Sequence, residues 1–288
     1  MRKVGLYRRG ERVEPEVLKN IPEESVGVFE TVRAYDGVVF HLEEHLDRLR
    51  ESAKTAGYRL PRTDCEIRAE IDHAIADQGA LDAVIRLTFM EDELFIMVGS
   101  KVHPKTLYEQ GVRLRTSPVR RALTQASFPE AKTSCYPNGV MAFMEPRAPE
   151  IYEWVFLNRE GLVTEVSIGN LFLAPSQGPG KGACGVLKTP PVLGILNGVT
   201  RRFVIECASQ LGLRVEEVPL TRHEVFNAAE VFLTNTSWEV LPVRELDGRE
   251  IGNKIPGIRT QQIHREFKKR VLEYVQSHHP PRASQRFR

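Results

Sequence analysis

Apolar and polar residues alternate near the N-terminus, in the segment SVGVFETVRAYDGVVFHL. Asp36-Gly37 divides this segment into two strand-like runs, and an Asp-Gly pair favours the positive φ angles of a tight turn. The pattern therefore predicts a β-hairpin. Because side chains alternate between the two faces of a strand, one face of the first run carries Phe29, Thr31 and Arg33.

The spacing of apolar residues then changes to that of amphipathic helices. HLEEHLDRLRESAKTAG and CEIRAEIDHAIADQG both have helical periodicity, with Gly57 and Gly79 placed to end the helices. AVIRLTFM and ELFIMVGS, on either side of Glu91-Asp92, are typical of strands. We expect a small α+β unit that ends near residue 115, followed by a proline-containing connection, TSPVRRALTQASFPEA.

Strands dominate the pattern in the rest of the chain. EWVFLN, LVTEVS and NLFLA predict neighbouring antiparallel strands, and AAEVFLTN and EVLPVREL predict two more. Between these groups, LNGVTRRFVIECASQLGL has the periodicity of a helix that ends at Gly212, and another helix is expected just after Lys132. SQGPGKGACG lacks the spacing of a phosphate-binding P-loop, so we interpret it as a flexible hairpin tip.

Composition narrows the classes of function. Of the 288 residues, 40 are Lys or Arg and 38 are Asp or Glu, so the net charge of +2 gives no general attraction to nucleic acid or an anionic membrane. A small molecule is the expected partner. The four cysteines include no C-x-x-C pair, and no stretch approaches the ~18 consecutive apolar residues of a membrane span. With no signal-like N-terminus, these features predict a soluble cytoplasmic protein with reduced thiols.

Lys132, in PEAKTSCYPNGVMAF, is the first candidate for chemistry. Most lysines are solvated surface charges, but a lysine among small and aromatic neighbours can lose its hydration. This loss lowers the pKa of the amine and makes it a nucleophile toward carbonyls. The segment alone supports both interpretations.

His41 and His45 are four residues apart, a spacing found in some metal sites. However, no glutamate directly follows the first histidine and no third ligand is in view. We interpret both histidines as surface or capping residues and predict no metal site.

Several segments, in their order, bear on the question of Lys132. FETVRAYDG with HLEEHLDRLRESA, AKTSCYPNGVMA, GLVTEVSIGNLFLA, TPPVLGILNGVTR and EVFLTNTSWEVLPV resemble the motif series of the class IV pyridoxal-phosphate enzymes. The resemblance covers residues 25–265. It implies pyridoxal 5'-phosphate (PLP) as cofactor and an α/β (α+β) fold of PLP fold type IV, with the cofactor held between two domains.

The same resemblance implies a domain organisation. A small N-terminal α/β domain is expected over residues 1–118, an interdomain loop over 119–130, and a larger PLP-binding domain with a β-barrel-like core over 131–275. Residues 276–288 are polar and are expected to be a frayed tail. The family's members imply a homodimer with active sites near the subunit interface.

Roles for individual residues also follow from the resemblance. Lys132 matches the lysine that forms the Schiff base with the cofactor and moves a proton, and Glu165 matches the carboxylate that keeps the pyridine nitrogen protonated. Arg48 and the helix that opens at Gly198-Val199-Thr200 offer N–H donors to the phosphate. In the structural alternatives, Arg48 pairs with a neighbouring glutamate and Thr200 is a plain N-cap.

The resemblance implies further contacts. Those with the cofactor are assigned to Tyr136, Asn235 and Thr236. Those with the substrate are assigned to Phe29, Thr31, Arg33, Arg86, Thr236 and Ser237.

The family contains branched-chain aminotransferases, D-amino acid aminotransferases and aminodeoxychorismate lyase. Thr31 in FETVR argues mildly against the branched-chain group, which carries FEGIR, whereas Phe89-Met90 stands where the other two groups carry Arg-Gly. We predict an aminotransferase that exchanges an amino group between a branched-chain L- or a D-amino acid and a 2-oxo acid. The alternatives are a lyase that releases pyruvate from aminodeoxychorismate and a cofactor-binding protein without turnover.

Overall fold

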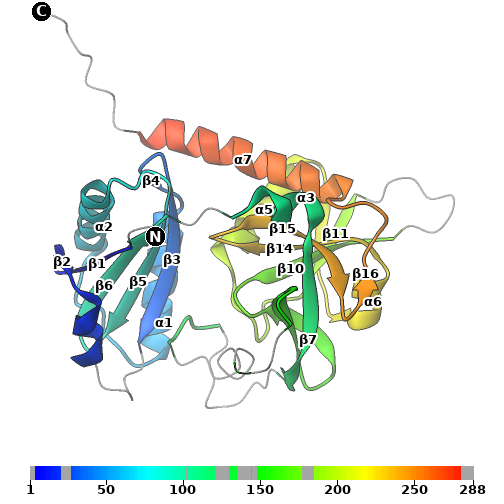
Figure 1. Cartoon of the computed structure of the whole chain (residues 1–288), viewed down its shortest axis with the longest axis horizontal. Coiled ribbons are helices and arrows are strands. Elements are labelled where there is room, and N and C mark those ends of the chain that lie inside the picture. Colours follow the sequence, from blue (N-terminus) through cyan, green and yellow to red (C-terminus); the bar gives the residue numbers. More distant parts are fainter. Residues whose placement is uncertain are drawn as a thin grey trace, which may run out of the picture.

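Two sheets organise the chain. The computed structural model describes residues 4–20, 27–100, 103–120, 130–134, 144, 148–176 and 185–279. Figure 1 shows a six-stranded sheet with its helices on one side of the molecule and a ten-stranded sheet on the other. A long helix, α7 (Ile258–His278), runs along the top of both parts.

The N-terminal sheet is antiparallel and has the strand order β2-β1-β6-β5-β3-β4. Two helices, α1 (Leu42–Thr55) and α2 (Asp64–Gln78), pack on one of its faces and supply much of its buried core. A short 3-10 helix spans Pro15–Asn20. The strands are β1 (Gly5–Arg8), β2 (Glu11–Val13), β3 (Val28–Tyr35), β4 (Val38–Val39), β5 (Ala83–Met90) and β6 (Glu93–Gly99).

The predicted hairpin and helices of this part are confirmed. Asp36 and Gly37 have φ angles of 49° and 81° at the turn between β3 and β4. Thr63 and Glu66 form a capping box at the start of α2, and Gly79 ends that helix in the left-handed conformation. These local signals agree with the hydrophobic pattern, which is why the sequence predicted this part well.

Strand β3 has two chemically different faces. Its even-numbered residues are buried against α1, and one of them is Glu30. Its odd-numbered residues, Phe29, Thr31, Arg33 and Tyr35, are partly exposed on the opposite face. The predicted shared face of Phe29, Thr31 and Arg33 is therefore confirmed.

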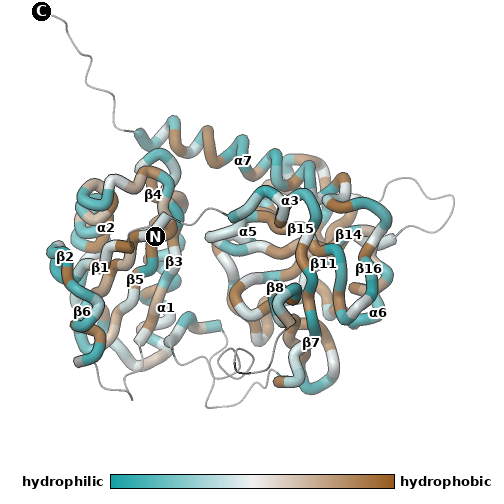
Figure 2. Tube along the Cα trace, viewed as in Figure 1, coloured by the Kyte–Doolittle hydropathy of each residue, from teal (hydrophilic) through white to brown (hydrophobic). Residues whose placement is uncertain are grey.

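The second sheet follows the path β12-β11-β10-β14-β15-β7-β8-β9-β13, with β16 paired to β15. Figure 2 shows hydrophobic residues along the strands of both sheets. The core of this part lies inside the curled sheet and under α5 and α7. The strands are β7 (Val112–Arg120), β8 (Ile151–Leu157), β9 (Leu162–Val166), β10 (Asn170–Pro175), β11 (Val186–Thr189), β12 (Arg214–Glu217), β13 (Leu220–Thr221), β14 (Ala228–Asn235), β15 (Glu239–Leu246) and β16 (Arg249–Glu250).

One predicted pairing in this sheet is wrong. β8 and β9 pair as expected, but β10 pairs with β14 and β11 rather than extending the same meander. The reason is a tight turn at residues 167–169, closed by a bridge between Val166 and Gly169, which redirects the chain. Turn direction of this kind depends on the long-range partner of β10, which lies about 60 residues away.

The boundary between the two parts also differs from the expected interdomain loop. β7 pairs in parallel with β15 and β8, and α3 (Lys105–Gln110) packs on β15, so both belong with the second sheet. We therefore propose a boundary between β6 and α3 instead of residues 119–130. The expected helix after Lys132 and most of the SQGPGKGACG tip fall on residues 135–143 and 177–184, which lie outside the described residues.

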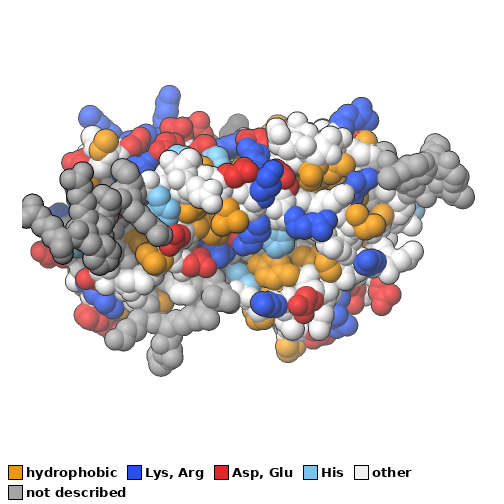
Figure 3. Space-filling model, turned by 90° about the horizontal axis from the view of Figure 1, so that it is seen from above, with side chains coloured by type: hydrophobic (Ala, Val, Ile, Leu, Met, Phe, Trp, Pro, Cys, Tyr) orange, Lys and Arg blue, Asp and Glu red, His pale blue; other side chains and the backbone are white. Residues whose placement is uncertain are grey.

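The helices of the second part include α5 (Val199–Gln210), which the sequence predicted, and α6 (Arg222–Phe226) and α7, which it did not. The tail was expected to begin at residue 276, but α7 continues to His278. Its last turns are held because Tyr274 packs edge-on against Phe40, with ring centroids 4.9 Å apart. In Figure 3, which looks down on the α7 side, Lys/Arg and Asp/Glu side chains are intermixed, in keeping with the small net charge.

Candidate active site

The backbone of Lys132 is fixed between a strand and a helix. Its N–H donates to Ser52 Oγ of α1 at 2.9 Å, and its carbonyl accepts from Phe29 N at 3.0 Å. The next residue, Thr133, forms a bridge with Val28. Residues 130–134 therefore lie along the edge of β3, and the position of the lysine side chain is set by the N-terminal sheet.

The amine of Lys132 is in an unusual environment for a lysine. Nζ lies 4.6 Å from the centroid of the Phe29 ring. Burial lowers the pKa of the amine from 10.5 to about 8; the charge of Glu30 opposes this shift, and the charges of Arg48 and Arg86 add to it. A larger share of neutral amine is therefore present near neutral pH than for an ordinary lysine, as a nucleophile requires.

Glu30, His45 and Arg48 form a buried group directly behind this lysine, which we call the Glu30 cluster. Glu30 accepts from Arg48 Nε at 2.6 Å, from Arg48 Nη2 at 2.8 Å and from His45 Nδ1 at 2.8 Å. Burial acts to raise the pKa of Glu30, but the charges of Arg48 and His45 outweigh it and hold that pKa well below its usual range. Glu30 is thus a carboxylate at neutral pH.

The histidines of HLEEH differ from each other and from the prediction. His45 is buried rather than on the surface, because its ring donates to Glu30 inside the core, and burial lowers its pKa. His41 is the residue before α1 and interacts with Glu44, but its side chain makes no capping hydrogen bond. No group of His, Cys, Asp and Glu in the described part of the chain is placed to hold a metal ion.

Arg48 forms the glutamate pair that was the structural alternative in the sequence analysis, and its role toward the phosphate stays a prediction. It pairs side-on with Glu30, and its Nη1 donates at 2.9 Å to the carbonyl of Asn197, directly before α5. These contacts use three of the five N–H groups of the guanidinium. The remaining N–H groups are at the end of the side chain beside α5, where they would donate hydrogen bonds to an oxyanion.

The N-terminus of α5 has the features of an anion site. Its N-cap is Gly198, so Thr200 is not a plain N-cap, and no side chain caps the helix. A Cβ at Gly198 would collide with Asn170 Oδ1, so only glycine fits there. The free N–H groups of the first turn and the helix dipole favour an anion, and Thr200 lines one pocket together with Thr236.

Glu165 is a buried carboxylate near the same helix. It lies on β9 and accepts from Asn170 Nδ2 and from Leu196 N, each at 3.2 Å. Asn170 Nδ2 also donates to the carbonyl of Leu196 at 3.0 Å. Because Leu196 is joined through Asn197 to Arg48, these contacts connect Glu165 to the Glu30 cluster and Lys132.

The turn between β14 and β15 carries the other predicted residues. Asn235 orders the turn, because its Oδ1 accepts from the N–H groups of Ser237 and Trp238, both at 2.8 Å. Ser237 is buried, and its hydroxyl contacts His103 Nε2 at 2.9 Å. Of the predicted turn residues, Thr236 lines the pocket next to α5.

The outer face of β3 and β5 carries the predicted substrate residues. The Arg86 guanidinium stacks over the Phe29 ring at 3.8 Å, and Thr31 lies opposite Arg86 in the strand register. Arg33, in contrast, faces Asp82 and the β14–β15 turn. Tyr136 lies outside the described residues.

A cofactor with a phosphate, a reactive aldehyde and a ring nitrogen fits this donor set. An amine with a lowered pKa, a buried carboxylate and an uncapped helix N-terminus are the three groups that PLP requires. A sequence model of the family described as amino-transferase class IV matches residues 27–246. The chain belongs to the class IV aminotransferases.

Individual relatives of this aminotransferase agree with the assignment. A putative branched-chain-amino-acid aminotransferase of Methanocaldococcus jannaschii is 37% identical over 255 residues, which cover 84% of this chain and 86% of the relative. A D-alanine aminotransferase of Bacillus licheniformis is 29% identical over 261 residues, 85% of this chain and 88% of that protein. Both matches extend through the two sheets.

A solved structure shows the same fold. The T.th. branched-chain amino acid aminotransferase with pyridoxamine 5'-phosphate has a TM-score of 0.82 and 28% identity, and the match covers 97% of each chain. That protein has also been solved with N-(5'-phosphopyridoxyl)-L-glutamate. The predicted fold type, the PLP cofactor and the aminotransferase activity are therefore confirmed, and the comparisons favour this activity over the lyase and over a protein without turnover.

Several residues of the aminotransferase site were not predicted from the sequence. They are Glu30, His45, Ser52, Asn170 and Asn197. A signal existed for Glu30, because it is a charged residue at a position of β3 where the alternation calls for an apolar side chain.

The helices in the described residues include none that is long and apolar enough to span a membrane.

Proposed function

We propose that this aminotransferase moves the amino group of a branched-chain L-amino acid to a 2-oxo acid, with Lys132 as its catalytic residue. The observation that carries the proposal is the amine of the half-buried Lys132, which lies over the Phe29 ring and has a pKa lowered to about 8. The activity named for the Methanocaldococcus jannaschii relative supports the branched-chain substrate, and the D-alanine enzyme provides the alternative that an experiment must exclude.

The cofactor-binding roles in this proposal follow the geometry of the site. Lys132 would hold the cofactor and, once the substrate has released it, would take the proton from the substrate Cα, and Glu165 would face the ring nitrogen. Bound PLP supplies an electron sink for the charge left when the substrate Cα loses its proton. Phosphate donors would come from Arg48, Gly198, Val199, Thr200 and Thr236. Tyr136 and Asn235 complete the proposed cofactor set.

The substrate would lie against the outer face of β3 and β5. Arg86 is the cation that we assign to a substrate carboxylate, since its planar guanidinium is oriented by stacking on Phe29. Phe29 and Thr31 would contact the substrate side chain. Arg33 and Ser237 are also assigned to the substrate site, because the hydrogen bond between them holds the β14–β15 turn. The L-glutamate adduct of the solved T.th. enzyme supports 2-oxoglutarate as an acceptor.

The first experiment follows the visible absorption band of the yellow protein after L-leucine or D-alanine is added. We expect L-leucine to bleach the band and 2-oxoglutarate to restore it, while D-alanine has little effect. Bleaching by D-alanine alone would overturn the handedness that we propose. If neither amino acid bleaches the band but aminodeoxychorismate yields pyruvate, the lyase would replace the transaminase.

We also propose that the enzyme is a homodimer in the cytoplasm. Large apolar side chains are exposed at Met97, which pairs with Arg86 in the strand register, and at Ile168 and Leu193, which fits a surface that a second copy covers. Cys65 and Cys207 are free thiols, as expected in a reducing compartment. Light scattering that gives the mass of one chain would contradict the dimer.

A further inference from the structure

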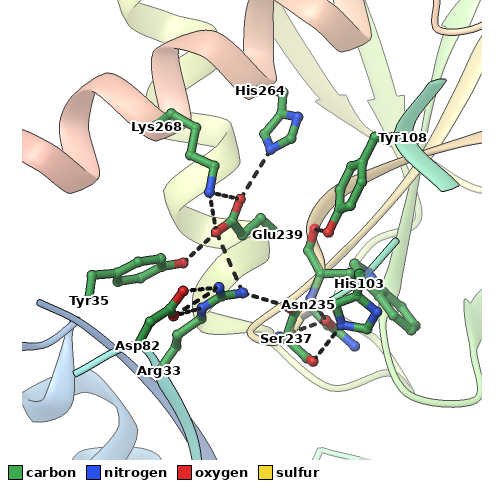
Figure 4. A network of polar contacts seen from close by, with 11 residues as sticks. Arg33, Tyr35, Asp82, His103, Tyr108, Asn235, Ser237, Glu239, His264 and Lys268 are labelled. Atoms are coloured by element: carbon green, nitrogen blue, oxygen red, sulfur yellow. Dashed lines mark hydrogen bonds and ion pairs between the residues drawn. The ribbon is translucent and has the colours of Figure 1, made fainter. Parts of the chain in front are cut away.

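A second buried carboxylate, Glu239, lies where β3, α7 and the β14–β15 turn meet (Figure 4). It accepts from Tyr35 OH at 2.8 Å, from Lys268 Nζ at 2.7 Å and from His264 Nε2 at 3.1 Å. Arg33 Nη1 lies 3.7 Å from its Oε1. We call these five residues the Glu239 cluster. Its members come from three segments that are far apart in the sequence.

The Glu239 cluster is connected directly to the pocket next to α5. Arg33 Nη1 donates at 2.7 Å to the carbonyl of Ser237, so the arginine that Glu239 attracts also holds the turn. Thr236, the preceding residue, lines that pocket with Thr200. Tyr108 OH donates to the carbonyl of Trp238 at 3.1 Å and fixes the other side of the turn. Movement of Glu239 would therefore displace the turn at the pocket.

The backbone at Glu239 indicates that its side chain is needed. Its φ angle is 64°, in the left-handed region where glycine is favoured. The residue pairs with Asn235 and closes a three-residue loop, a position where hairpins commonly carry glycine. A glutamate here bears a conformational cost that glycine would avoid, and the contacts of its carboxylate offset that cost.

Charge supports the same conclusion. Burial acts to raise the pKa of Glu239, but the hydrogen bond from His264 and the charges of Lys268 and Arg33 lower it to about 2. Without the carboxylate, the largely buried Arg33 would keep only the exposed Asp82 as a counter-charge in the described part of the chain, while the half-exposed Lys268 would turn into solvent. The cluster therefore depends on Glu239 more than on any one of its cations.

We propose that Glu239 is a positioning residue that holds β3 and α7 against the β14–β15 turn and thereby keeps Thr236 at the phosphate side of the cofactor site. The link to the phosphate rests on the proposed function, whereas the effect on the turn does not. Two measurements are therefore needed, one on the phosphate and one on the turn itself.

Three variants separate the carboxylate from the backbone. Glu239→Gln removes the charge, and Glu239→Gly removes the side chain while relieving the left-handed φ. The matched control is Glu245→Gln on the same strand, because Glu245 pairs with Arg113 at 3.0 Å, outside the cluster. Melting temperatures identify any variant that fails to fold. Glu239→Gly is the variant that we least expect to unfold, because glycine favours the left-handed φ.

The first measurement titrates each full-length apo-protein with PLP and with pyridoxal, which lacks the phosphate. We expect both Glu239 variants to bind PLP about tenfold more weakly, the loss expected for one or two hydrogen bonds, with pyridoxal binding unchanged. Glu245→Gln should match the wild type. Unchanged PLP binding by Glu239→Gly, or an equal loss for both ligands, would overturn the phosphate link.

The second measurement reports on the turn without any cofactor. The chain has two tryptophans, Trp154 and Trp238, and Trp238 is buried in the turn next to Glu239. In a Trp154→Phe background we expect Glu239→Gln and Glu239→Gly to shift the Trp238 emission to longer wavelength and to increase its quenching by acrylamide. Identical emission in all variants would overturn the positioning role. If the wild type binds PLP and pyridoxal equally, the proposed phosphate site fails, and emission alone then decides the inference.

Discussion

Glu30 and Glu239 are both buried carboxylates that hold an arginine, but they act on opposite faces of β3. The partners of Glu30 come from α1, within 18 residues, and its side chain has 0% exposure. The partners of Glu239 come from β3 and α7, and Lys268 among them is 50% exposed. The side chains of the Glu30 cluster all come from the N-terminal part, from which Arg48 reaches the Asn197 carbonyl, whereas the side chains of the Glu239 cluster come from both parts of the molecule.

This difference shows how a single strand serves two purposes. The inner face of β3 carries the Glu30 cluster, which fixes Arg48 and influences the charge of Lys132. The outer face carries Arg33 and Tyr35, which reach the second part of the chain. Because the strand places consecutive side chains on opposite sides, catalysis and the joining of the two parts are built from neighbouring residues.

The largest effect is expected at Lys132, whose charge the Glu30 cluster influences. Lys132→Ala should lower kcat by at least about 10³-fold, because no other amine in the proposed site takes over proton transfer. Steady-state kinetics with L-leucine and 2-oxoglutarate measure the loss. An activity within tenfold of the wild type would remove Lys132 from the mechanism.

The next largest effect is on the free energy of unfolding, which should differ between the variants of Glu30 and Glu239. Glu30→Gln should lower the free energy of unfolding by about 3 to 5 kcal/mol, because it leaves Arg48 buried with no opposite charge. Glu239→Gln should cost less, about 1 to 3 kcal/mol, because Lys268 can turn into solvent. Urea unfolding of both apo-proteins tests this order. A larger loss for Glu239→Gln would reverse the comparison.

Acid should weaken both clusters in the same direction. The folded pKa of each carboxyl is lowered below its unfolded value, so its contribution is fully present above the unfolded pKa of about 4.3 and is lost as pH falls through the folded pKa. The loss from Glu239 should be half complete at about pH 3, midway between the unfolded pKa of about 4.3 and the folded pKa of about 2. Between pH 5 and pH 2, melting temperature should therefore fall less steeply for Glu239→Gln than for the wild type. Parallel curves would show that folding does not lower the pKa of the Glu239 carboxyl.

The smallest effect concerns the pH dependence of Lys132. Its folded pKa of about 8 lies below the unfolded value of 10.5, so the folded protein binds fewer protons between these values and apo-protein stability should rise with pH there. Glu30→Gln removes the anion that raises this pKa, so it should shift the window to lower pH. A titration of Lys132 by NMR in both proteins measures the shift, and an upward shift would contradict it.

Local signals in the sequence predicted the N-terminal part well. Asp36-Gly37, Gly79 and the helical spacing of α1 act over a few residues, and the structure follows them. The pairing of β10 with β14 and the parallel pairing of β7 depend on partners that lie more than 30 residues away, which no local pattern specifies.

The candidate site shows the same difference between local sequence signals and contacts with distant partners. Lys132, Arg48 and Glu165 were found because they lie in ordered motifs. Glu239 was missed because its partner Tyr35 lies 204 residues away in the sequence, and only the fold brings the two together. Tertiary contacts of this kind carry no local signature.

The most direct test of the central claim identifies the lysine that holds the cofactor. Borohydride reduction of the yellow holoenzyme should attach the cofactor permanently to one side chain, and peptide mapping by mass spectrometry then locates it. We predict a single modified peptide that contains Lys132, with PLP bound in the wild type before reduction. Modification of a different lysine, with Lys132 unmodified, would contradict the account of this site.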